Sequence, residues 1–425
     1  MFLKKLFDGK SKFFIYMLIA QLLFMLSNLF INYKIEKIWS LEGFATYNLL
    51  KRLASFIVFP LVLGVGIGIP RYISFLKNGK DDKSQGLEYL FAGLIIFFTT
   101  FIAFFILLIL FPELILYSFK KSGSNSILII VALFVFSQGV FVIISSFYRG
   151  KIQFGRSSLL NVLVLSLLPT VIIFFSKNIF DYFLYYALLT IVLLTIIIAF
   201  NIYNNSISYK RTKFKVRQLL HYGAPRVVGD AILFSLDFIP IYFVSVFISL
   251  EESGYLSLSF IFFKLASVSF DLIGSLILPV YGKGFKNESS AVFIKKVNVL
   301  LLVSGSLALM ASVLGYLLIP YLIVTFFSSL SNAILASQYI FIALPFYVVF
   351  TILKNVLDII SHKAYNSLIQ IGGFIAMALT LFYGIYQKEW FYYRTLTIII
   401  PYFVLGVLTY IFWNKLKYKM VNNLI

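Results

Sequence analysis

The chain of 425 residues contains no cysteine and only two histidines, His221 and His362. Without cysteine there are no disulfides, no thiolate metal site and no thiol chemistry. Two histidines are too few for us to expect a histidine-based metal site. Acidic residues are also scarce, because 16 Asp and Glu stand against 36 Lys and Arg, which gives a formal net charge of +20. We therefore predict no metal or other cofactor.

Charged side chains are missing from long stretches of the sequence. Tyr89 to Pro112 is 24 residues without one, and Val297 to Leu353 is 57. A bilayer core takes about 20 apolar residues per helix, so the longer stretch must hold two spans and a turn. Apolar residues make up 61% of the chain, far above a soluble domain. These continuous runs differ from the alternating strands of membrane barrels and predict an all-α, polytopic membrane protein.

The hydropathy pattern predicts twelve transmembrane helices. They cover residues 13–32, 44–70, 89–111, 125–147, 158–176, 181–202, 220–244, 254–280, 297–319, 333–353, 366–386 and 391–413. The first is long enough to span and lacks a small-residue cleavage site, so we predict a membrane helix and not a signal peptide. The longest predicted loop covers about 203–219. We interpret residues 204–219 as a basic cytoplasmic linker between two six-helix halves, 1–203 and 220–425.

The basic residues gather on one side of this predicted topology. The loops that share a side with the two termini hold 25 of the 36 Lys and Arg residues. The positive-inside rule then places both termini in the cytoplasm. Lys outnumbers Arg 28 to 8, and with so much Phe, Ile, Tyr and Asn this suggests a bacterial chain, for which we expect the inner membrane. The charge lies in short loops beside spans, where anionic membrane lipids attract it. It does not form the folded basic patch that nucleic-acid binding requires, so we predict no nucleic-acid partner.

The two halves resemble each other at an offset of 209 positions. Eight residues recur without a gap, and Gln21 and Asn28 fall on Asp230 and Asp237. The identical pairs are Tyr33 and Tyr242, Ser40-Leu41-Glu42 and Ser249-Leu250-Glu251, Leu49 and Leu258, Leu63 and Leu272, Pro70 and Pro279, and Tyr72 and Tyr281. Because six spans is an even number, both halves begin on the same side of the membrane. The pattern therefore predicts two parallel repeats, as in many transporters.

Ionisable residues inside predicted spans are costly in a bilayer, at about 2.5–3.5 kcal/mol each at a helix centre, and usually serve a function. The set consists of Lys51, Arg52, Arg226, Asp230, Asp237, Lys264 and Asp271. Lys264 and Asp271 are seven residues apart and share a helix face, as do Gln21 and Asn28. These stripes occupy the first two spans of each half. We predict that they line one central cavity between the halves.

Simpler roles exist for several members of this set. Arg226 and Asp230 are four residues apart on one predicted helix, where they can pair with each other. Lys51 and Arg52 can extend toward the bilayer surface from a position near a span end. Both interpretations stay open at the level of sequence.

Short motifs in each half resemble the Wzx-type polysaccharide flippases, the polysaccharide transporter branch of the multidrug/oligosaccharidyl-lipid/polysaccharide (MOP) exporter superfamily. The first half carries Trp39-Ser40-Leu41-Glu42-Gly43-Phe44-Ala45-Thr46-Tyr47 and Gly66-Ile67-Gly68-Ile69-Pro70-Arg71-Tyr72-Ile73-Ser74. The second half carries Tyr222-Gly223-Ala224-Pro225, Asp237, Ser253-Gly254-Tyr255 and Leu278-Pro279. The resemblance extends over the whole chain in length, span count and repeat.

This resemblance implies transport of undecaprenyl-diphosphate-linked oligosaccharide repeat units, such as those of O-antigen in lipopolysaccharide or of capsule, from the cytoplasmic to the outer leaflet by alternating access. No ATP-binding domain is evident, so any active transport would use an ion gradient, of protons or sodium, or a separate motor protein. We assign the cationic residues Lys51, Arg52, Arg226 and Lys264 to the substrate, and Asp230, Asp237 and Asp271 to ion coupling, with Gln21 and Asn28 as polar cavity residues. A glycan polymerase and a chain-length regulator are the implied partners.

Three alternatives remain open. A cation-coupled drug exporter of the MATE type would favour an acidic or apolar cavity, whereas this set holds four basic and three acidic residues. A lipid II flippase would have more spans and a longer chain. A membrane-embedded glycan polymerase or glycosyltransferase would need a large external loop or an acidic catalytic motif, and the repeat also argues against an enzyme.

Overall fold

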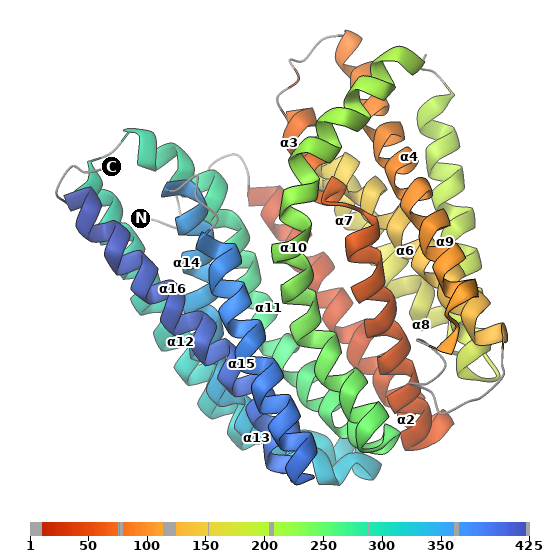
Figure 1. The fold of residues 1–425 in the computed structure, drawn as a ribbon, viewed down its shortest axis with the longest axis vertical. Helices are drawn as coiled ribbons and strands as arrows, with labels where there is room; N and C mark the ends of the chain where they lie inside the picture. Colours follow the sequence, from red (N-terminus) through yellow and green to blue (C-terminus); the bar gives the residue numbers. More distant parts are fainter. Residues whose placement is uncertain are drawn as a thin grey trace. The chain divides into compact units, whose positions relative to one another are not determined.

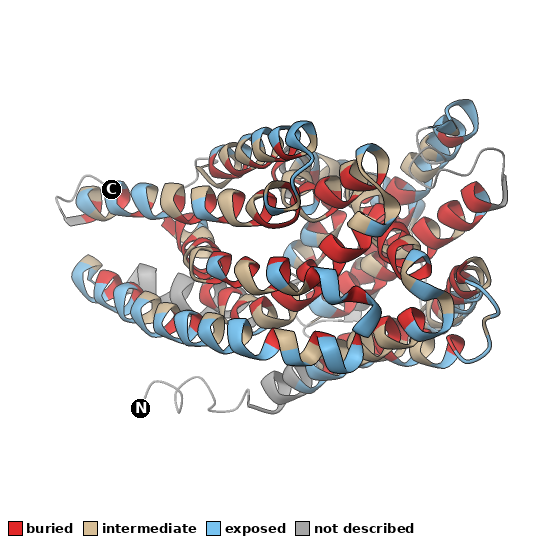
Figure 2. Cartoon of the chain, turned by 90° about the horizontal axis from the view of Figure 1, so that it is seen from below, coloured by how far each residue is buried: buried red, intermediate tan, exposed pale blue. Residues whose placement is uncertain are grey.

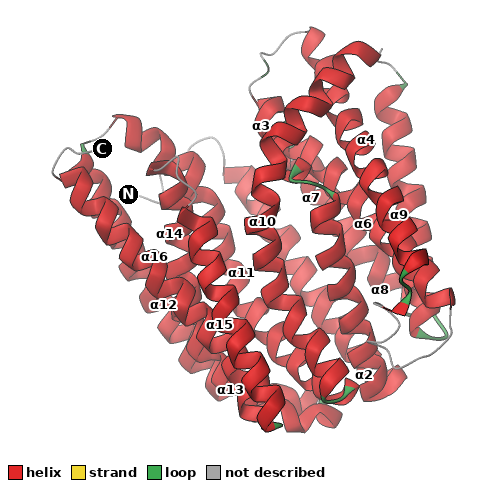
Figure 3. Ribbon diagram, viewed as in Figure 1, coloured by secondary structure: helices red, strands yellow, loops and turns green. Residues whose placement is uncertain are grey.

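The computed structural model describes residues 11–74, 76, 80–113, 125–151, 153–203, 208–287, 289–360 and 365–421. Every regular element in these residues is a helix (Figure 3). The chain divides into two compact units, Met1–Ala231 and Ile232–Ile425, and each is described by itself below. The boundary between them falls inside one helix, α10 (Tyr209–Phe247).

The N-terminal unit is built from helices that follow one another along the chain (Figure 1). They are α2 (Ser11–Leu61), α3 (Val65–Ser74), α4 (Lys80–Leu110), α6 (Asn125–Gly150), α7 (Phe154–Val162), the π-helix η2 (Leu163–Leu167), α8 (Leu168–Ile172), α9 (Ile179–Ile202) and the first part of α10. Helix α6 packs against α2, α3, α4 and α9 and is the most central of them.

Helix α2 is a hairpin of two antiparallel arms. Trp39 and Ser40 leave helical geometry, and Ser40 takes a φ of +64°, in the region that favours glycine. Across the bend, Asn48 Nδ2 lies 3.0 Å from Asn32 Oδ1, and Lys51 Nζ lies 2.5 Å from Asn28 Oδ1. Each contact joins residues placed about equally far on either side of Ser40, as an antiparallel pair requires. The two arms correspond to the first two predicted spans.

A second break separates α2 from α3 and bends the chain by 55°. Leu63 and Gly64 both have positive φ, at 46° and 68°. The break brings the backbone against α10, because a Cβ added to Gly223 would lie 2.2 Å from the carbonyl oxygen of Leu63. A Cβ on Gly64 would in turn lie 2.7 Å from Gly223 Cα. Glycine at both positions is therefore required for this backbone crossing.

The C-terminal unit begins with the rest of α10 and has a comparable helical hairpin. Its elements are α11 (Leu250–Asn287), α12 (Ser290–Phe326), the 3₁₀-helix η3 (Ser328–Ala333), α13 (Ile334–Tyr339), the 3₁₀-helix η4 (Ile340–Ala343), α14 (Leu344–Ile360), α15 (Tyr365–Gln387), the π-helix η5 (Phe391–Leu396) and α16 (Thr397–Val421). The hairpin turn lies at Ile248 and Ser249, between α10 and α11. Helix α14 packs against α11, α12 and α16, and α16 packs against α15.

The described helices agree with the predicted spans. Nine are long and apolar enough to cross a bilayer, and α10 adds the shorter apolar segment Ala231–Phe247. The two arms of α2, the second bent into α3, account for the remaining two of twelve. One expectation was wrong, because the predicted loop at 203–219 is helical from Tyr209 onward, as the start of α10.

Burial separates interior helices from peripheral ones (Figure 2). In the apolar part of α6, 72% of the residues are buried, whereas in α12 the share is 17%. The exposed side of α12 carries residues such as Leu302, Leu317 and Val324. An apolar surface of this extent suits contact with lipid and would be unfavourable in water.

Candidate functional site

The C-terminal unit brings three of the predicted ionisable residues together. Asp237 lies on α10, and Lys264 and Asp271 lie on one face of α11. Lys264 Nζ is 2.8 Å from Asp237 Oδ2. The lysine side chain is 36% exposed and the aspartate 23%, so the pair is only partly withdrawn from its surroundings. Two carboxylates and one ammonium group give this cluster a formal charge of −1.

Two tyrosines complete the cluster from other helices. Tyr347 of α14 donates a hydrogen bond of 2.5 Å to Asp271 Oδ1, and Tyr402 of α16 donates one of 3.4 Å to Asp237 Oδ1. The two rings meet edge to face with centroids 5.2 Å apart, and both pack on Phe263. Both tyrosines are buried. Four helices thus fix the positions of the two carboxylates.

The N-terminal unit holds a lysine in a corresponding hairpin. Lys51, on the second arm of α2, donates to the side-chain oxygen of Asn28 on the first arm, at 2.5 Å. Its ammonium nitrogen also lies 5.6 Å from the centre of the Tyr47 ring, a cation–π distance. Among the described residues, Lys51 has no carboxylate partner. Arg52 follows directly in the chain, so two cationic side chains are adjacent here.

A chain of amides supports the position of Asn28. Asn32 Nδ2 lies 2.7 Å from the Asn28 carbonyl oxygen, and Asn48 Nδ2 donates to Asn32 Oδ1. Asn32 and Asn48 are fully or nearly fully buried. Buried amides are retained when their hydrogen bonds are satisfied, and these fix the register of the two arms.

The two lysine contacts occupy corresponding places in the repeat. Asn28 and Asp237 are equivalent at the offset of 209, and each accepts a lysine ammonium from the second arm of its hairpin. The lysines themselves are not equivalent, because Lys51 corresponds to position 260 (51 plus 209), one helical turn before Lys264. The geometry is shared, whereas the acceptor is a neutral amide in one unit and a carboxylate in the other.

The remaining predicted site residues are less fully defined. Gln21 lies two turns before Asn28 on the same face of α2. The Nε atom of Arg52 is buried. Arg226 and Asp230 lie on α10, but their side chains fall outside the described residues, so their predicted pairing and roles stay predictions.

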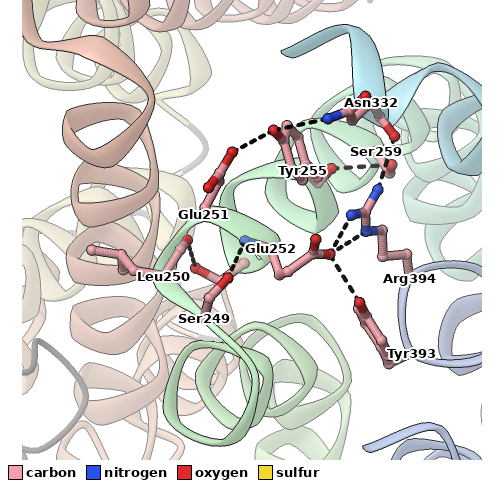
Figure 4. Close-up of polar contacts among 10 residues, drawn as sticks. Ser249, Leu250, Glu251, Glu252, Tyr255, Ser259, Asn332, Tyr393 and Arg394 are labelled. Atoms are coloured by element: carbon pink, nitrogen blue, oxygen red, sulfur yellow. Dashed lines mark hydrogen bonds and ion pairs between the residues drawn. The ribbon is translucent and has the colours of Figure 1, made fainter. Parts of the chain in front are cut away.

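A second polar cluster in the C-terminal unit is absent from the sequence-based set (Figure 4). Its centre is an ion pair between Glu252, at the start of α11, and Arg394 of η5. Arg394 Nη1 also donates to the carbonyl of Asn332 in η3 at 2.8 Å, and Tyr393 donates to Glu252 at 3.0 Å. Arg394 is buried. It lies within the predicted span 391–413, so the presence of a charged residue inside a span was the sequence signal that could have identified it.

The edges of this cluster are also hydrogen-bonded. The guanidinium carbon of Arg394 lies 4.6 Å from the centre of the Tyr255 ring, and Tyr255 donates to Glu251 at 2.6 Å. Ser249 accepts the backbone N–H of Glu252 at 3.0 Å and caps α11 (Figure 4). Because these groups bond to one another across α11, η3 and η5, we interpret the cluster as a structural contact that holds the three elements together.

The start of α10 is fastened to the N-terminal unit by another unpredicted ion pair. Arg211 Nε lies 2.9 Å from the fully buried carboxylate of Glu88 on α4. Nearby, Gln218 accepts a hydrogen bond of 2.8 Å from Tyr89, and the Lys215 ammonium lies 4.5 Å from the centre of the Tyr89 ring. Burial lowers the pKa of Lys215, with Glu88 opposing the shift and Arg211 adding to it. These contacts explain why the basic segment is helical.

The described residues contain no group of three or more His, Cys, Asp or Glu side chains placed to hold a metal ion. The lysine of the Asp237 cluster instead supplies the positive charge beside the carboxylates. The chemistry available there is reversible charge pairing.

Comparison with known proteins gives the same architecture. Residues 17–172 match the MatE family model, and no match was found among curated protein sequences. A multidrug resistance MATE family transporter of the MOP superfamily, inward-facing, aligns with a TM-score of 0.77 and 14% identity over 96% of this chain and 99% of that one. The lipid II flippase MurJ, in an inward closed conformation, aligns with a TM-score of 0.73 and 14% identity over 96% of this chain and 90% of that one. A MOP superfamily transporter from Pyrococcus furiosus aligns with a TM-score of 0.69 and 14% identity over 96% of this chain and 95% of that one. That protein is described by a reversed polarity of its binding pocket.

At this identity the structural matches establish the fold. The chain is a multi-pass membrane protein with the fold of MATE-type transporters of the MOP superfamily. The structural match confirms the predicted all-α architecture of twelve helices in two repeats.

Proposed function

We propose that this chain is a flippase for undecaprenyl-diphosphate-linked oligosaccharide repeat units, which it moves to the outer leaflet by alternating access. The observation that carries the proposal is the contrast between the two hairpins. Lys51 meets the neutral Asn28 in one unit, whereas Lys264 meets Asp237 in the other. One unit keeps a net cationic site, and the other balances its lysine with two carboxylates.

The N-terminal site has the chemistry that a diphosphate needs. A diphosphate carries two or more negative charges, and lysine ammonium and arginine guanidinium groups are its usual protein partners. Lys51 donates to the neutral amide of Asn28 and not to a carboxylate, and Arg52 is a second basic residue at the next position in the chain. Asn28, Asn32 and Asn48 supply an amide chain that holds the lysine in place. Arg226 stays a proposed contributor.

The C-terminal site has the chemistry that ion coupling needs. Asp237 and Asp271 accept hydrogen bonds from Tyr402 and Tyr347, and Lys264 pairs with Asp237. A carboxylate that binds a cation in one conformation and releases it in another links an ion gradient to transport. Lys264, predicted among the substrate cations, therefore moves in this proposal to the coupling site.

A second candidate is a cation-coupled exporter of drugs or other small molecules. It is favoured by the MatE match over residues 17–172 and by the alignment with a multidrug transporter at a TM-score of 0.77. The alignment with a lipid II flippase at 0.73 favours lipid-linked cargo. The discriminating feature is the cationic N-terminal site, which suits an anionic cargo and opposes a cationic drug.

The decisive experiment is deletion of the gene followed by lipid extraction. We expect lipid-linked repeat units to accumulate in the cytoplasmic leaflet, and wild-type protein, but not Lys51→Met, to restore surface glycan. Lys51→Met removes the charge and keeps a similar side-chain volume. Lys213→Met, at an exposed lysine of α10, is the control for loss of one lysine charge. Normal surface glycan together with altered drug sensitivity would instead support the exporter.

The proposal includes location and partners. Both termini lie in the cytoplasm, the chain resides in a bacterial inner membrane, and a glycan polymerase and chain-length regulator receive the product. The basic loops contact anionic lipid.

A further inference from the structure

The position of Lys264 bears on which ion the coupling site uses. Its ammonium nitrogen lies 2.8 Å from Asp237 Oδ2, about the distance at which a charge-assisted hydrogen bond forms. The other oxygen of Asp237 accepts from Tyr402, and Asp271 accepts from Tyr347. The lysine nitrogen also lies 5.9 Å from the centre of the Tyr347 ring. A cation of the chain itself thus pairs with Asp237, and it lies on the face of α11 that also carries Asp271.

The backbone of α10 and α11 offers few free oxygens to a metal ion beside this cluster. Sodium sites in transporters combine side-chain oxygens with carbonyl groups released where a membrane helix is unwound. Residues 232–247 of α10 and 250–271 of α11 are unbroken helix in the structure. Pro240 leaves the carbonyl of Leu236 without an intrahelical N–H donor. The other oxygen donors at the cluster are the carboxylates and the phenol hydroxyls, and Lys264 already engages Asp237.

We propose that Lys264 is a tethered cation that takes the place of a bound monovalent metal ion beside Asp237 and Asp271. The C-terminal unit then has no sodium site in the wild-type protein. Removal of the lysine charge exposes two carboxylates that attract sodium. This inference rests on the coupling role proposed for Asp237, and it narrows the coupling ion from proton or sodium to a proton.

The test measures binding of radioactive sodium to purified full-length protein in detergent, with no glycan substrate present. We expect no saturable sodium binding by the wild type, saturable binding of about one sodium by Lys264→Gln, and none by Lys264→Arg, which keeps the charge. The double variant Asp237→Asn with Lys264→Gln should lose the gained site. Tryptophan-fluorescence melting and size-exclusion profiles establish that each variant is folded.

Two results would overturn the inference. One is stoichiometric sodium binding by the wild type that Asp237→Asn abolishes, a measurement that needs no lysine variant. The other is a folded Lys264→Gln protein without any gain in sodium binding. Since sodium binding is measured without cargo, these outcomes are independent of whether the chain exports lipid-linked glycan. If deletion of the gene caused no accumulation of lipid-linked repeat units, the proposed function would be contradicted, whereas the sodium-binding result would still stand.

Discussion

Lys264 and Asp237 form an ion pair of 2.8 Å at the place where, in the other repeat, Lys51 donates to Asn28 at 2.5 Å. The acceptors are equivalent in sequence, and the lysines differ by one helical turn. The contact geometry is therefore common to both units, while the charge of the acceptor differs. This difference, together with Asp271 as a second carboxylate, leaves a cationic site in one hairpin and a formal charge of −1 at the cluster in the other. The separate roles proposed above for the two sites rest on it.

Substitution of Asn28 by Asp should give Lys51 a carboxylate partner, as Lys264 has in Asp237. The new carboxylate would pair with Lys51 and offset its charge, which leaves Arg52 as the remaining cation. We expect glycan export to fall at least about tenfold, equivalent to about 1.4 kcal/mol of lost interaction, while the melting temperature is unchanged or higher. Asn201→Asp on α9 is the control, because Asn201 bonds to Tyr148 away from this site. Full export by a folded Asn28→Asp variant would argue against a cationic substrate site.

Replacement of Asp237 by Ala should abolish glycan export without lowering the amount of protein in the membrane. The variant loses the carboxylate that pairs with Lys264 and accepts from Tyr402. Export is measured as surface glycan in the deletion strain, and protein by immunoblotting of membranes. Glu389→Gln, an exposed acidic residue between α15 and η5, is the control for loss of one negative charge. Normal export by Asp237→Ala would contradict the coupling role.

The pair formed by Glu252 and Arg394 should stabilise the C-terminal unit. Loss of one partner of a buried pair costs about 3–5 kcal/mol, and the partial exposure of Glu252 places the expected cost near the lower bound of about 3 kcal/mol. Arg394→Gln alone should therefore melt at a clearly lower temperature than the wild type, as followed by tryptophan fluorescence. The double variant Glu252→Gln with Arg394→Gln should recover part of that loss. Additive effects of the two single substitutions would show that the pair contributes little.

Sequence patterns predicted the helices well because a membrane span must be apolar along its whole length, and this property is visible in the sequence itself. They did not predict the helix that begins at Tyr209, since its stability comes from Arg211 meeting Glu88, which is distant in sequence. The same limit applies to the site. Asp237 and Lys264 were both identified as ionisable residues in spans, but their pairing depends on hairpin register.

Tyr347 and Tyr402 were missed for a different reason. They lie in apolar stretches where a tyrosine is an ordinary core or interface residue, and only the contacts with Asp271 and Asp237 distinguish them. Asn32 and Asn48 were missed although each is a polar residue in or beside a predicted span. The repeat alignment also gave no hint of the lysine contacts, because the two lysines are displaced by a turn.

Substitution of Gly223 by Ala should disrupt the contact of α10 with the break between α2 and α3. The added Cβ would lie 2.2 Å from the Leu63 carbonyl oxygen, so the backbones must separate. We expect lower thermal stability or loss of folded protein. Gly305→Ala in α12 is the matched control, since no atom lies within 4 Å of its added Cβ and the exchange favours the helix by about 1 kcal/mol. Equal melting temperatures for both variants would contradict the described crossing.

The absence of cysteine allows a direct test of the predicted topology, because any introduced cysteine is the only one in the chain. Lys213→Cys on α10 and Glu389→Cys before η5 change two exposed residues on predicted opposite sides of the membrane. A membrane-impermeant maleimide should label Glu389→Cys in intact spheroplasts and Lys213→Cys only after the membrane is opened. The positive-inside rule gives this orientation, because Lys213 lies in the most basic of the predicted loops. Labelling of Lys213→Cys in sealed spheroplasts would reverse the topology and place the termini outside.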